Sequence, residues 1–436
     1  MRYMVRILIS TVLLLIYHSI YGQLKGDYSD IFMEHLYQSR SPIKSFDAKT
    51  LSYDDLEPIG KAIGDRKIVL LGEPSHGDGG AIQMKTRLVK YLHEKKGFDV
   101  LLFEDDMCSI LFDLSEINDT ALVRIKAQEN IMSSLSKSAV SKDFWNYYNQ
   151  QLSNGSKIHL GGIHPWHCGK FAKTRLLNLL TEELSKLNYN TSSKSYQRLL
   201  KDINYTFQYL WESKKDSVDT NNYFKEIGKI EEVFKYHTQP IEKRNLWLLE
   251  IANLKNCFEF LVNGKNRDIY YAQNLALIAK YIYPDKKIIV WSHNNHNAMD
   301  VNVLASFDAD FAKWWHIENT YATFTYFGAD AFREFGNNVY SLAITSGSGN
   351  FSQNFMENGY QVHDFKSAKV IKSSENSLEY YLANKKCDVV FIPFPSVQGR
   401  PSGYPWFTSR LLDLSFEAKM DYISAFSGII YINEVV

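Results

Sequence analysis

The sequence predicts an α/β fold with a mainly parallel central sheet, and one stretch of forty residues carries most of that prediction. Within Lys67–Asp106, the apolar runs Ile68–Leu71 and Val100–Phe103 flank a segment with helical periodicity. A strand, a helix and a second strand over this length form the pattern of a parallel βαβ unit. Further apolar runs of strand length are Lys157–Ile163, Lys287–Trp291, Ala322–Phe327, Val339–Thr345, Val389–Ile392 and Ile429–Ile432.

A long helical region interrupts these strands. Helices are expected at Thr174–Leu187, Ser195–Ser213, Phe224–Tyr236, Ile241–Val262 and Arg267–Tyr283. An insertion of this kind most simply forms a helical subdomain or lid over the crevice of the sheet. The expected organisation is a signal peptide at 1–22, the N-terminal part of the α/β domain at 23–170, the helical insertion at 171–283 and the C-terminal part of the α/β domain at 284–436.

The N-terminal segment Met1–Gly22 has the pattern of an export signal. Arg2 and Arg6 give it a basic start, and Ile7–Ile16 forms an apolar core that is too short to span a bilayer. Cleavage is expected near Gln23, which predicts an exported protein, periplasmic or secreted, with no stable membrane anchor after cleavage. An uncleaved N-terminal anchor is the alternative interpretation.

The composition gives no sign of a strongly charged partner. Lysine plus arginine equals aspartate plus glutamate, at 49 each, so no basic field predicts nucleic-acid binding. Aromatic residues make up 14% of the chain, which suits a well-filled core or a roomy apolar pocket. Four widely spaced cysteines leave room for up to two disulfides in an exported protein, with the pairing open: Cys108, Cys168, Cys257 and Cys387.

Ionisable side chains follow four of the expected strands. They are Glu73 and His76, Glu104, His164 and His167, and His293 and His296. A histidine at the end of a single strand is commonly a structural residue. In a parallel sheet, however, the carboxyl ends of the strands meet at one edge, and ligands bind beyond that edge. The recurrence of such residues therefore predicts a functional site there.

Lys85 is an anomaly on the helix of the first βαβ unit. It lies in the middle of an apolar stripe that consists of Ala81, Ile82, Leu88, Val89 and Leu92. A lysine on such a face either extends its amine to solvent or pairs with a buried anion. Glu73 and Glu104 are the nearest candidate anions, and we expect Lys85 to pair with one of them.

Several of these motifs, taken together, resemble the erythromycin esterase family. They are Gly72–Gly77 (GEPSHG), Lys85 with Arg87, Phe103-Glu104, Trp291–His296 (WSHNNH), Phe327-Gly328 with Gly336, and Cys387–Pro393. The similarity spans roughly Leu56 to the C-terminus. It implies a hydrolase of small-molecule esters or macrolide lactones, with a link to antibiotic resistance. Relatives usually carry an aspartate where His164 stands, and this departure bears on the charge of the site and on its substrate.

The chemistry of these side chains predicts hydrolysis by an activated water. A neutral imidazole held by a carboxylate takes a proton from water near neutral pH, which makes His76 the expected base and Glu73 or Glu104 its orienting group. Lys85 and His293 are expected to stabilise the oxyanion that forms when water attacks an ester carbonyl. The expected substrate-binding residues are His164, His167, Trp291 and His296. No cofactor is expected.

Three alternatives stay open from the sequence. A serine hydrolase would use Ser75 or Ser292, but no GxSxG motif is present, and Ser292 faces away from its neighbour His293 on a strand. A metal-dependent hydrolase would use the same histidines and glutamates, which are acceptable zinc ligands. A non-enzymatic haem or cofactor-binding protein of the same fold group would use the crevice rich in histidine and tyrosine.

Overall fold

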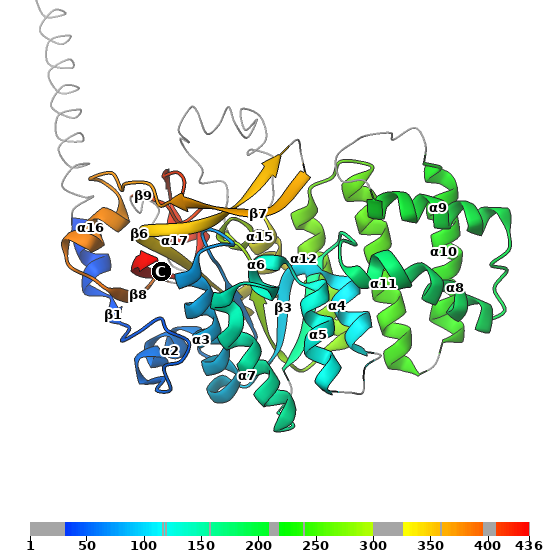
Figure 1. The fold of residues 1–436 in the computed structure, drawn as a ribbon, viewed down its shortest axis with the longest axis horizontal. Coiled ribbons are helices and arrows are strands. Elements are labelled where there is room, and N and C mark those ends of the chain that lie inside the picture. The colour runs from blue at the N-terminus through cyan, green and yellow to red at the C-terminus, as the bar shows by residue number, and fades with distance from the viewer. Residues whose placement is uncertain are drawn as a thin grey trace, which may run out of the picture.

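The computed structural model describes residues 31–115, 117, 120–156, 158–208, 218–238, 240–299, 326–357, 360–395 and 407–435. They form a twisted sheet with helices on both faces (Figure 1). The expected export signal at 1–22 lies outside these residues, as does most of the strand expected at 322–327. Phe327 itself begins a helix. Within the described part of the chain, no helix is both long and apolar enough for a membrane span.

The central sheet has nine strands, and its middle is parallel. The strands are β1 (Ser41–Pro42), β2 (Ile68–Leu71), β3 (Phe98–Asp106), β4 (His159–His164), β5 (Lys287–Trp291), β6 (Val339–Glu357), β7 (Tyr360–Lys369), β8 (Val389–Pro393) and β11 (Gly428–Val435). In space their order is β1-β8-β11-β6-β2-β5-β3-β4, with β7 paired to β6. Every pair from β11 to β4 is parallel, and β1, β7 and β8 pair antiparallel. The predicted α/β class with a mainly parallel sheet is confirmed. A separate ribbon pairs β9 (Phe407–Ser409) with β10 (Ala418–Met420).

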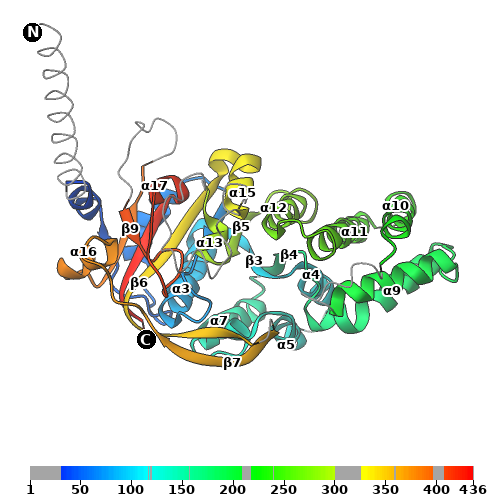
Figure 2. The ribbon, with the colours of Figure 1, turned by 90° about the horizontal axis from the view of Figure 1, so that it is seen from above.

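The two faces of the sheet are covered by different helices (Figure 2). On one face, Leu71 and Phe103 pack in a core with α3 (Gly79–Lys96) and α7 (Lys142–Ser153). On the other, the alternate residues of the strands pack against α12 (Arg267–Leu277) and α15 (Phe327–Phe335). Because successive side chains of a strand point to opposite faces, an unbroken apolar run is what a sheet covered on both sides requires. The apolar runs of β2 and β5 are therefore read correctly from the sequence.

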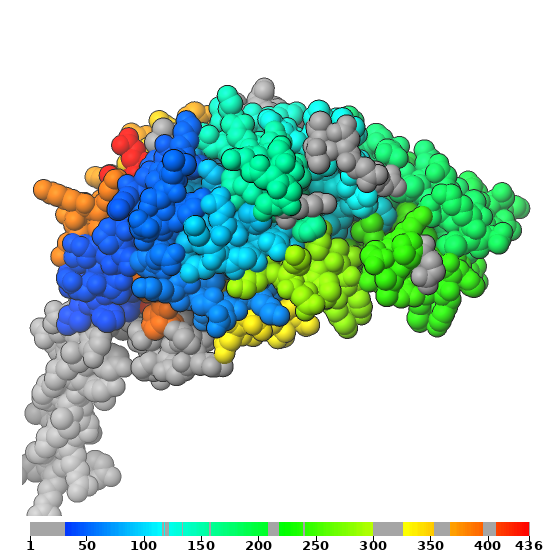
Figure 3. Space-filling view, turned by 90° about the horizontal axis from the view of Figure 1, so that it is seen from below, coloured from blue at the N-terminus to red at the C-terminus, as the bar shows by residue number. Residues whose placement is uncertain are grey.

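The remaining helices surround this core. They are η1 (Asp54–Leu56), α2 (Glu57–Ile63), α4 (Met107–Ser115), α5 (Thr120–Asn130), α6 (Ser133–Ser136), η2 (Ala139–Ser141), η3 (Ala172–Leu176), α8 (Leu177–Lys186), α9 (Lys194–Gln208), α10 (Thr220–His237), α11 (Ile241–Leu261), η5 (Ile278–Ile282), α13 (Asn294–Asn297), η7 (Gly336–Asn338), α16 (Leu378–Asn384) and α17 (Tyr422–Ala425). Helices α8 to α11 occupy one end of the molecule, coloured green in Figure 3. They enclose a hydrophobic cluster that includes Tyr196, Ile230, Trp247 and Phe258. The helices expected in this region are present, and the end of the one expected at Ser195–Ser213 lies outside the described residues.

Strand β6 is much longer than the expected Val339–Thr345. It continues through Ser346–Gly349 because β11 pairs with it as far as Val435, whose partner in the register is Gly349. Beyond the sheet, β6 and β7 form an antiparallel hairpin. That hairpin meets the loop after β2, where the Ser352 amide donates to the Gly77 carbonyl over 3.0 Å. The long strand thus connects the sheet to the loop that carries His76.

Gly77 is required by this contact. A Cβ atom at this position would overlap the backbone carbonyl of Ser352, which has no freedom to rotate away. All four cysteines, by contrast, are free thiols, so the disulfides that the sequence left open do not form in the structure.

We expect Gly77→Ala to lower the free energy of unfolding by about 2 kcal/mol, the usual cost of forcing a methyl group into a packed position. Gly228→Ala is the matched control, because this helical glycine has open space around it and alanine is the better helix former. Urea unfolding of both variants measures the difference. Equal stability of the two would show that the hairpin does not hold the Gly77 loop.

Candidate active site

Three neighbouring strands deliver the candidate site. Strands β2, β5 and β3 lie side by side in parallel, so Glu73, Ser292 and Glu104 emerge at the same edge of the sheet. After β2, the backbone at Gly72 packs directly against Asn294, because a Cβ atom at Gly72 would overlap the side-chain oxygen of Asn294. Asp78 is the N-cap of helix α3, and its carboxylate accepts a hydrogen bond from the Ala81 amide over 2.9 Å. This N-cap places the first turns of α3 directly beside the strand ends.

Glu73 is the centre of the site. Its Oε1 accepts from His76 Nδ1 over 2.8 Å, and its Oε2 accepts from Lys85 Nζ over 2.9 Å and from Trp291 Nε1 over 3.1 Å. Burial opposes ionisation of this carboxyl, but the Lys85 charge and the His76 hydrogen bond outweigh it and lower its pKa to about 2. Glu73 is therefore ionised at neutral pH and fixes the direction of the His76 ring.

Lys85 is fully buried, as predicted, and its partner is Glu73. The alternative in which its amine extends to solvent is wrong. Besides Glu73, Nζ donates to the Ser292 carbonyl over 3.1 Å and lies 4.7 Å from the centroid of a Trp291 ring. Burial lowers the pKa of Lys85 to about 8 against the opposing charge of Glu73, so the amine stays largely protonated at pH 7. Because it contacts the oxygen of Glu73 that His76 does not use, the geometry favours a positioning role over the expected contact with an oxyanion.

Glu104 holds a second histidine. Its Oε2 accepts from the His293 backbone amide over 2.9 Å, and its Oε1 lies 3.1 Å from His296 Nε2. The other nitrogen of His296, Nδ1, lies 2.7 Å from Asp268 Oδ2. Burial disfavours a charged His296, but the two carboxylates outweigh it and raise its pKa to about 9, whereas His296 and His76 help to hold the pKa of Glu104 well below its usual range despite burial. His296 is thus an imidazolium clamped between two carboxylates.

His293 is neutral and has both nitrogens engaged. Burial and the nearby His76 lower its pKa to about 3. Its Nδ1 accepts from the Asn295 amide over 3.2 Å and caps α13, which leaves Nε2 to donate to the Pro74 carbonyl over 3.0 Å. The expected role of His293 in oxyanion stabilisation therefore requires that the bond to Pro74 break. In the observed arrangement the residue joins the loops that follow β2 and β5.

The two histidines after β4 go to different places. His164 lies near the site, with its ring centroid 5.0 Å from that of Tyr271, which is in turn 5.3 Å from His296. Burial and Arg267 hold the pKa of His164 well below its usual value, so the ring is neutral. His167 is not brought to the site. It is buried among helices, and its Nε2 lies 2.7 Å from Glu250 Oε1.

A small cavity lies at the centre of this arrangement. Its volume is about 10 Å³, the scale at which a single water molecule fits. Its walls include His76, Glu73, Glu104 and Ser292, and the segment around α6 contributes Met132, Ser134 and Leu135. The His76 side chain keeps 25% of its surface exposed, so the site opens to solvent on the side of this histidine.

Two residues of α12 belong to the site and were not predicted. Asp268 fixes His296, and the guanidinium of Arg267 lies 3.1 Å from His296 Nε2. Both lie in the expected helical insertion, and only the adjacent acidic and basic pair at the start of that helix could have drawn attention to them. Trp291, expected to bind substrate, is instead buried and donates to Glu73.

The metal alternative can be compared with the observed geometry. Among the described residues, one group of three potential ligands has its donor atoms within 4.8 Å of one another, and it consists of Cys108, His167 and Glu250. The carboxylates and imidazoles at the sheet edge are instead arranged as hydrogen-bonded pairs. Their arrangement suits proton transfer, with Glu73 orienting His76.

Comparisons with known proteins relate this chain to hydrolases. The model of the erythromycin esterase family matches residues 250–435. YbfO of Bacillus subtilis (strain 168), which is named as a hydrolase, is 28% identical over 279 residues, or 57% of this chain and 60% of YbfO. The match thus spans less than two thirds of that relative's length. The family model matches less than half of this chain, and together with the relative it supports an erythromycin esterase-like family.

Solved structures share the fold of this chain. A protein from Bacillus cereus has a TM-score of 0.68 at 17% identity, covering 93% of this chain and 98% of its own. A succinoglycan biosynthesis protein has a TM-score of 0.68 at 15% identity, with 94% and 98% covered. An erythromycin esterase mutant in its open conformation has a TM-score of 0.57 at 15% identity, with 91% and 98% covered. Family and relative together support a hydrolase.

We expect Lys85→Met to destabilise the protein by about 3 kcal/mol, because it leaves the Glu73 carboxylate buried without its cation. Methionine keeps the aliphatic stem, so the change tests charge more than packing. Lys95→Met is the control, since Lys95 lies on the exposed face near the end of the same helix. Chemical denaturation compares the two. A Lys85→Met protein as stable as the control would contradict the ion pair.

The pH dependence of turnover should report the Glu73–His76 pair. Burial opposes protonation of His76, but the Glu73 hydrogen bond and the Glu104 charge raise its pKa above 6.5. Because the base must be neutral, the rate should rise with pH through that raised pKa. Glu73→Gln removes one carboxylate charge and should move this limb of the profile to lower pH. An unchanged limb in the variant would mean that another group titrates.

Proposed function

We propose that this chain is a hydrolase in which His76 activates a water molecule for attack on an ester or lactone carbonyl. The observation that carries the proposal is the bond between His76 Nδ1 and Glu73 Oε1, 2.8 Å long. It places the proton of the neutral ring on Nδ1 and leaves Nε2 as the nitrogen that accepts a proton. The family match and the relative named as a hydrolase support the reaction class.

The reaction follows from these contacts. Water next to His76 gives a proton to Nε2 as its oxygen attacks the carbonyl carbon, and a tetrahedral oxyanion forms. The imidazolium is stabilised by the ionised Glu73, whose charge Lys85 maintains. His76 then returns the proton to the leaving alkoxide, and the products are a carboxylic acid and an alcohol. For a lactone, both groups remain on one opened ring.

The small volume of the cavity indicates where the water and the substrate bind. A volume of about 10 Å³ holds a water but no acyl group, so the substrate binds on the exposed side of His76. The site also contains two cationic side chains, the imidazolium of His296 and the guanidinium of Arg267. Either suits the stabilisation of a developing oxyanion once substrate contact displaces a current partner.

The substrate class is proposed from the family. One structural neighbour is titled an erythromycin esterase, and the corresponding proposal for this chain is a small-molecule ester or macrolide lactone. The neutral His164 stands where relatives usually carry an aspartate, so this chain lacks one negative charge near Tyr271. A substrate that depends on that carboxylate for binding should therefore be disfavoured here.

A panel of carboxylic esters and lactones, including erythromycin, tests this function. On any substrate turned over, His76→Asn should lower kcat by about 10²- to 10⁴-fold, the contribution typical of a general base. His237→Asn, at the exposed end of α10, is the matched control and should leave the rate unchanged. Ser75→Ala should also retain turnover, since the proposed nucleophile is water. Loss of turnover in Ser75→Ala would indicate a serine nucleophile instead, and retention of turnover in His76→Asn would show that His76 is not the base.

A further inference from the structure

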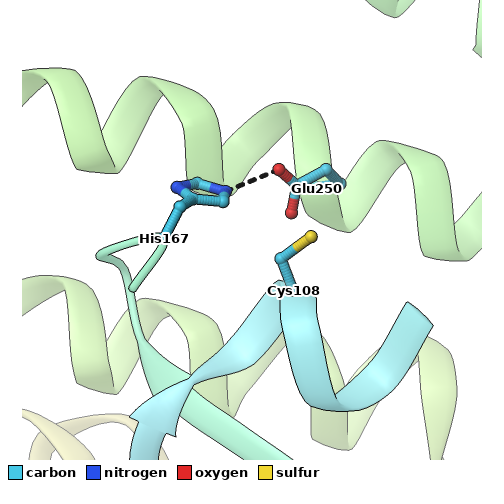
Figure 4. A group of neighbouring side chains, drawn as sticks. All are labelled: Cys108, His167 and Glu250. Carbon is cyan, nitrogen blue, oxygen red and sulfur yellow. Dashed lines mark hydrogen bonds and ion pairs between the residues drawn. The ribbon is translucent and has the colours of Figure 1, made fainter. Parts of the chain in front are cut away.

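A second cluster of reactive side chains lies outside the active site. Cys108 of α4, His167 of the loop after β4 and Glu250 of α11 are all fully buried, and they face one another (Figure 4). One potential ligand atom from each lies within 4.8 Å of the others. None of these residues contributes to the activation of water proposed above. Because burying ionisable groups is costly, three of them brought together from separate elements indicate a separate site.

The scaffold around the cluster is rigid. The buried Asp106 accepts from the Ser109 amide over 2.9 Å, and it also accepts from the Gly169 amide over 2.8 Å. This one carboxylate therefore fixes both the start of α4, which carries Cys108, and the loop that carries His167. On the third side, the Asn253 amide group donates to the Pro165 carbonyl over 3.3 Å and holds α11 against the same loop.

Two buried polar atoms of the cluster, Oε2 of Glu250 and Nδ1 of His167, have no nitrogen or oxygen as a hydrogen-bond partner. The neighbouring donors are thiols, that of Cys108 for Glu250 and that of Cys257 for His167. Leaving a buried polar atom without such a partner is unfavourable. The Cys108 thiol and the hydrogen-bonded His167–Glu250 pair are the groups that would lose protons to a metal ion.

We propose that Cys108, His167 and Glu250 form a zinc site. Thiolate, imidazole and carboxylate are the three ligand types that Zn²⁺ accepts in proteins. Zinc would displace two protons, one from the Cys108 thiol and one from the His167–Glu250 pair. The charges then balance, because the two positive charges of the ion meet one thiolate and one carboxylate beside a neutral imidazole. A net neutral centre is the arrangement that a fully buried position tolerates, and a neutral fourth ligand such as water completes the tetrahedron.

The required movement is small. Ligand distances of about 2.0–2.3 Å place tetrahedral donors roughly 3.3–3.7 Å apart. The 2.7 Å contact between His167 Nε2 and Glu250 Oε1 must therefore open slightly, and the thiol, which already lies within 4.8 Å of one ligand atom of each of these residues, must approach them. Both are side-chain rotations within a scaffold already fixed by Asp106.

The consequence would be a clamp between the helical region and the sheet. Glu250 lies on α11, whereas Cys108 lies at the start of α4, directly after the strand β3 that carries Glu104. Zinc would join these elements covalently through its ligands and would restrict movement of the helices relative to the strand end that carries Glu104. The expected result is greater stability of the loaded protein.

Cobalt titration of the metal-free full-length chain tests the site. Co²⁺ bound to a thiolate in tetrahedral geometry gives visible bands and a near-ultraviolet charge-transfer band. We expect one equivalent per chain, bleaching of these bands on addition of Zn²⁺, and a higher Tm with zinc than without. Cys387→Ser should behave like the wild type, because Cys387 is a buried thiol between α16 and β8, outside the cluster.

Cys108→Ser should abolish the charge-transfer band and the rise in Tm. Glu250→Gln and His167→Asn should weaken binding, and they provide the test if Cys108→Ser fails to fold. The absence of the band in the wild type would overturn the proposal. Persistence of the band in folded Cys108→Ser would also overturn it, by assigning the metal to another thiol. Neither result depends on hydrolytic activity, so the zinc site and the proposed function can fail separately.

Discussion

The buried ion pair between Lys85 and Glu73 is the interaction on which the arrangement of this site depends. Neither charge would be stable alone in this position, because removing an ion from water costs several kcal/mol. Lys85 and the Trp291 indole occupy one oxygen of the carboxylate, which leaves the other for His76. The sheet edge thus holds a carboxylate that stays ionised, and that carboxylate determines which nitrogen of His76 is basic. A strand end, a helix face and a neighbouring strand must all be in register for this to occur.

Much of the site was predictable because its residues are close in sequence or follow strands. Glu73 and His76 are three residues apart, and Lys85 interrupts an apolar helical stripe, so the sequence predicted that Lys85 is buried and pairs with Glu73 or Glu104. The parallel order of β2, β5 and β3 then brings Glu104 and the residues after Trp291 to the same edge. Local pattern and sheet topology were sufficient there.

The parts that the sequence did not predict depend on contacts between distant segments. Asp268 reaches His296 from a helix 28 residues upstream, and no motif marks it. His164 is the last residue of β4 and His167 follows shortly after it, but the turn that Asp106 holds directs His167 toward the helices. Strand β6 extends past Thr345 because β11 continues beside it. In each case the deciding partner lies far along the chain, where hydrophobic periodicity carries no information about it.

The most direct test of this account is an NMR titration of the His76 ring in the wild type and in Lys85→Met. We predict a neutral tautomer with its proton on Nδ1 and a pKa above 6.5 in the wild type. Removing the Lys85 charge should raise that pKa further, because this cation opposes protonation of the ring while Glu73 favours it. A proton on Nε2, or a pKa that does not respond to the loss of Lys85, would contradict the claim that the ion pair sets the basicity of His76.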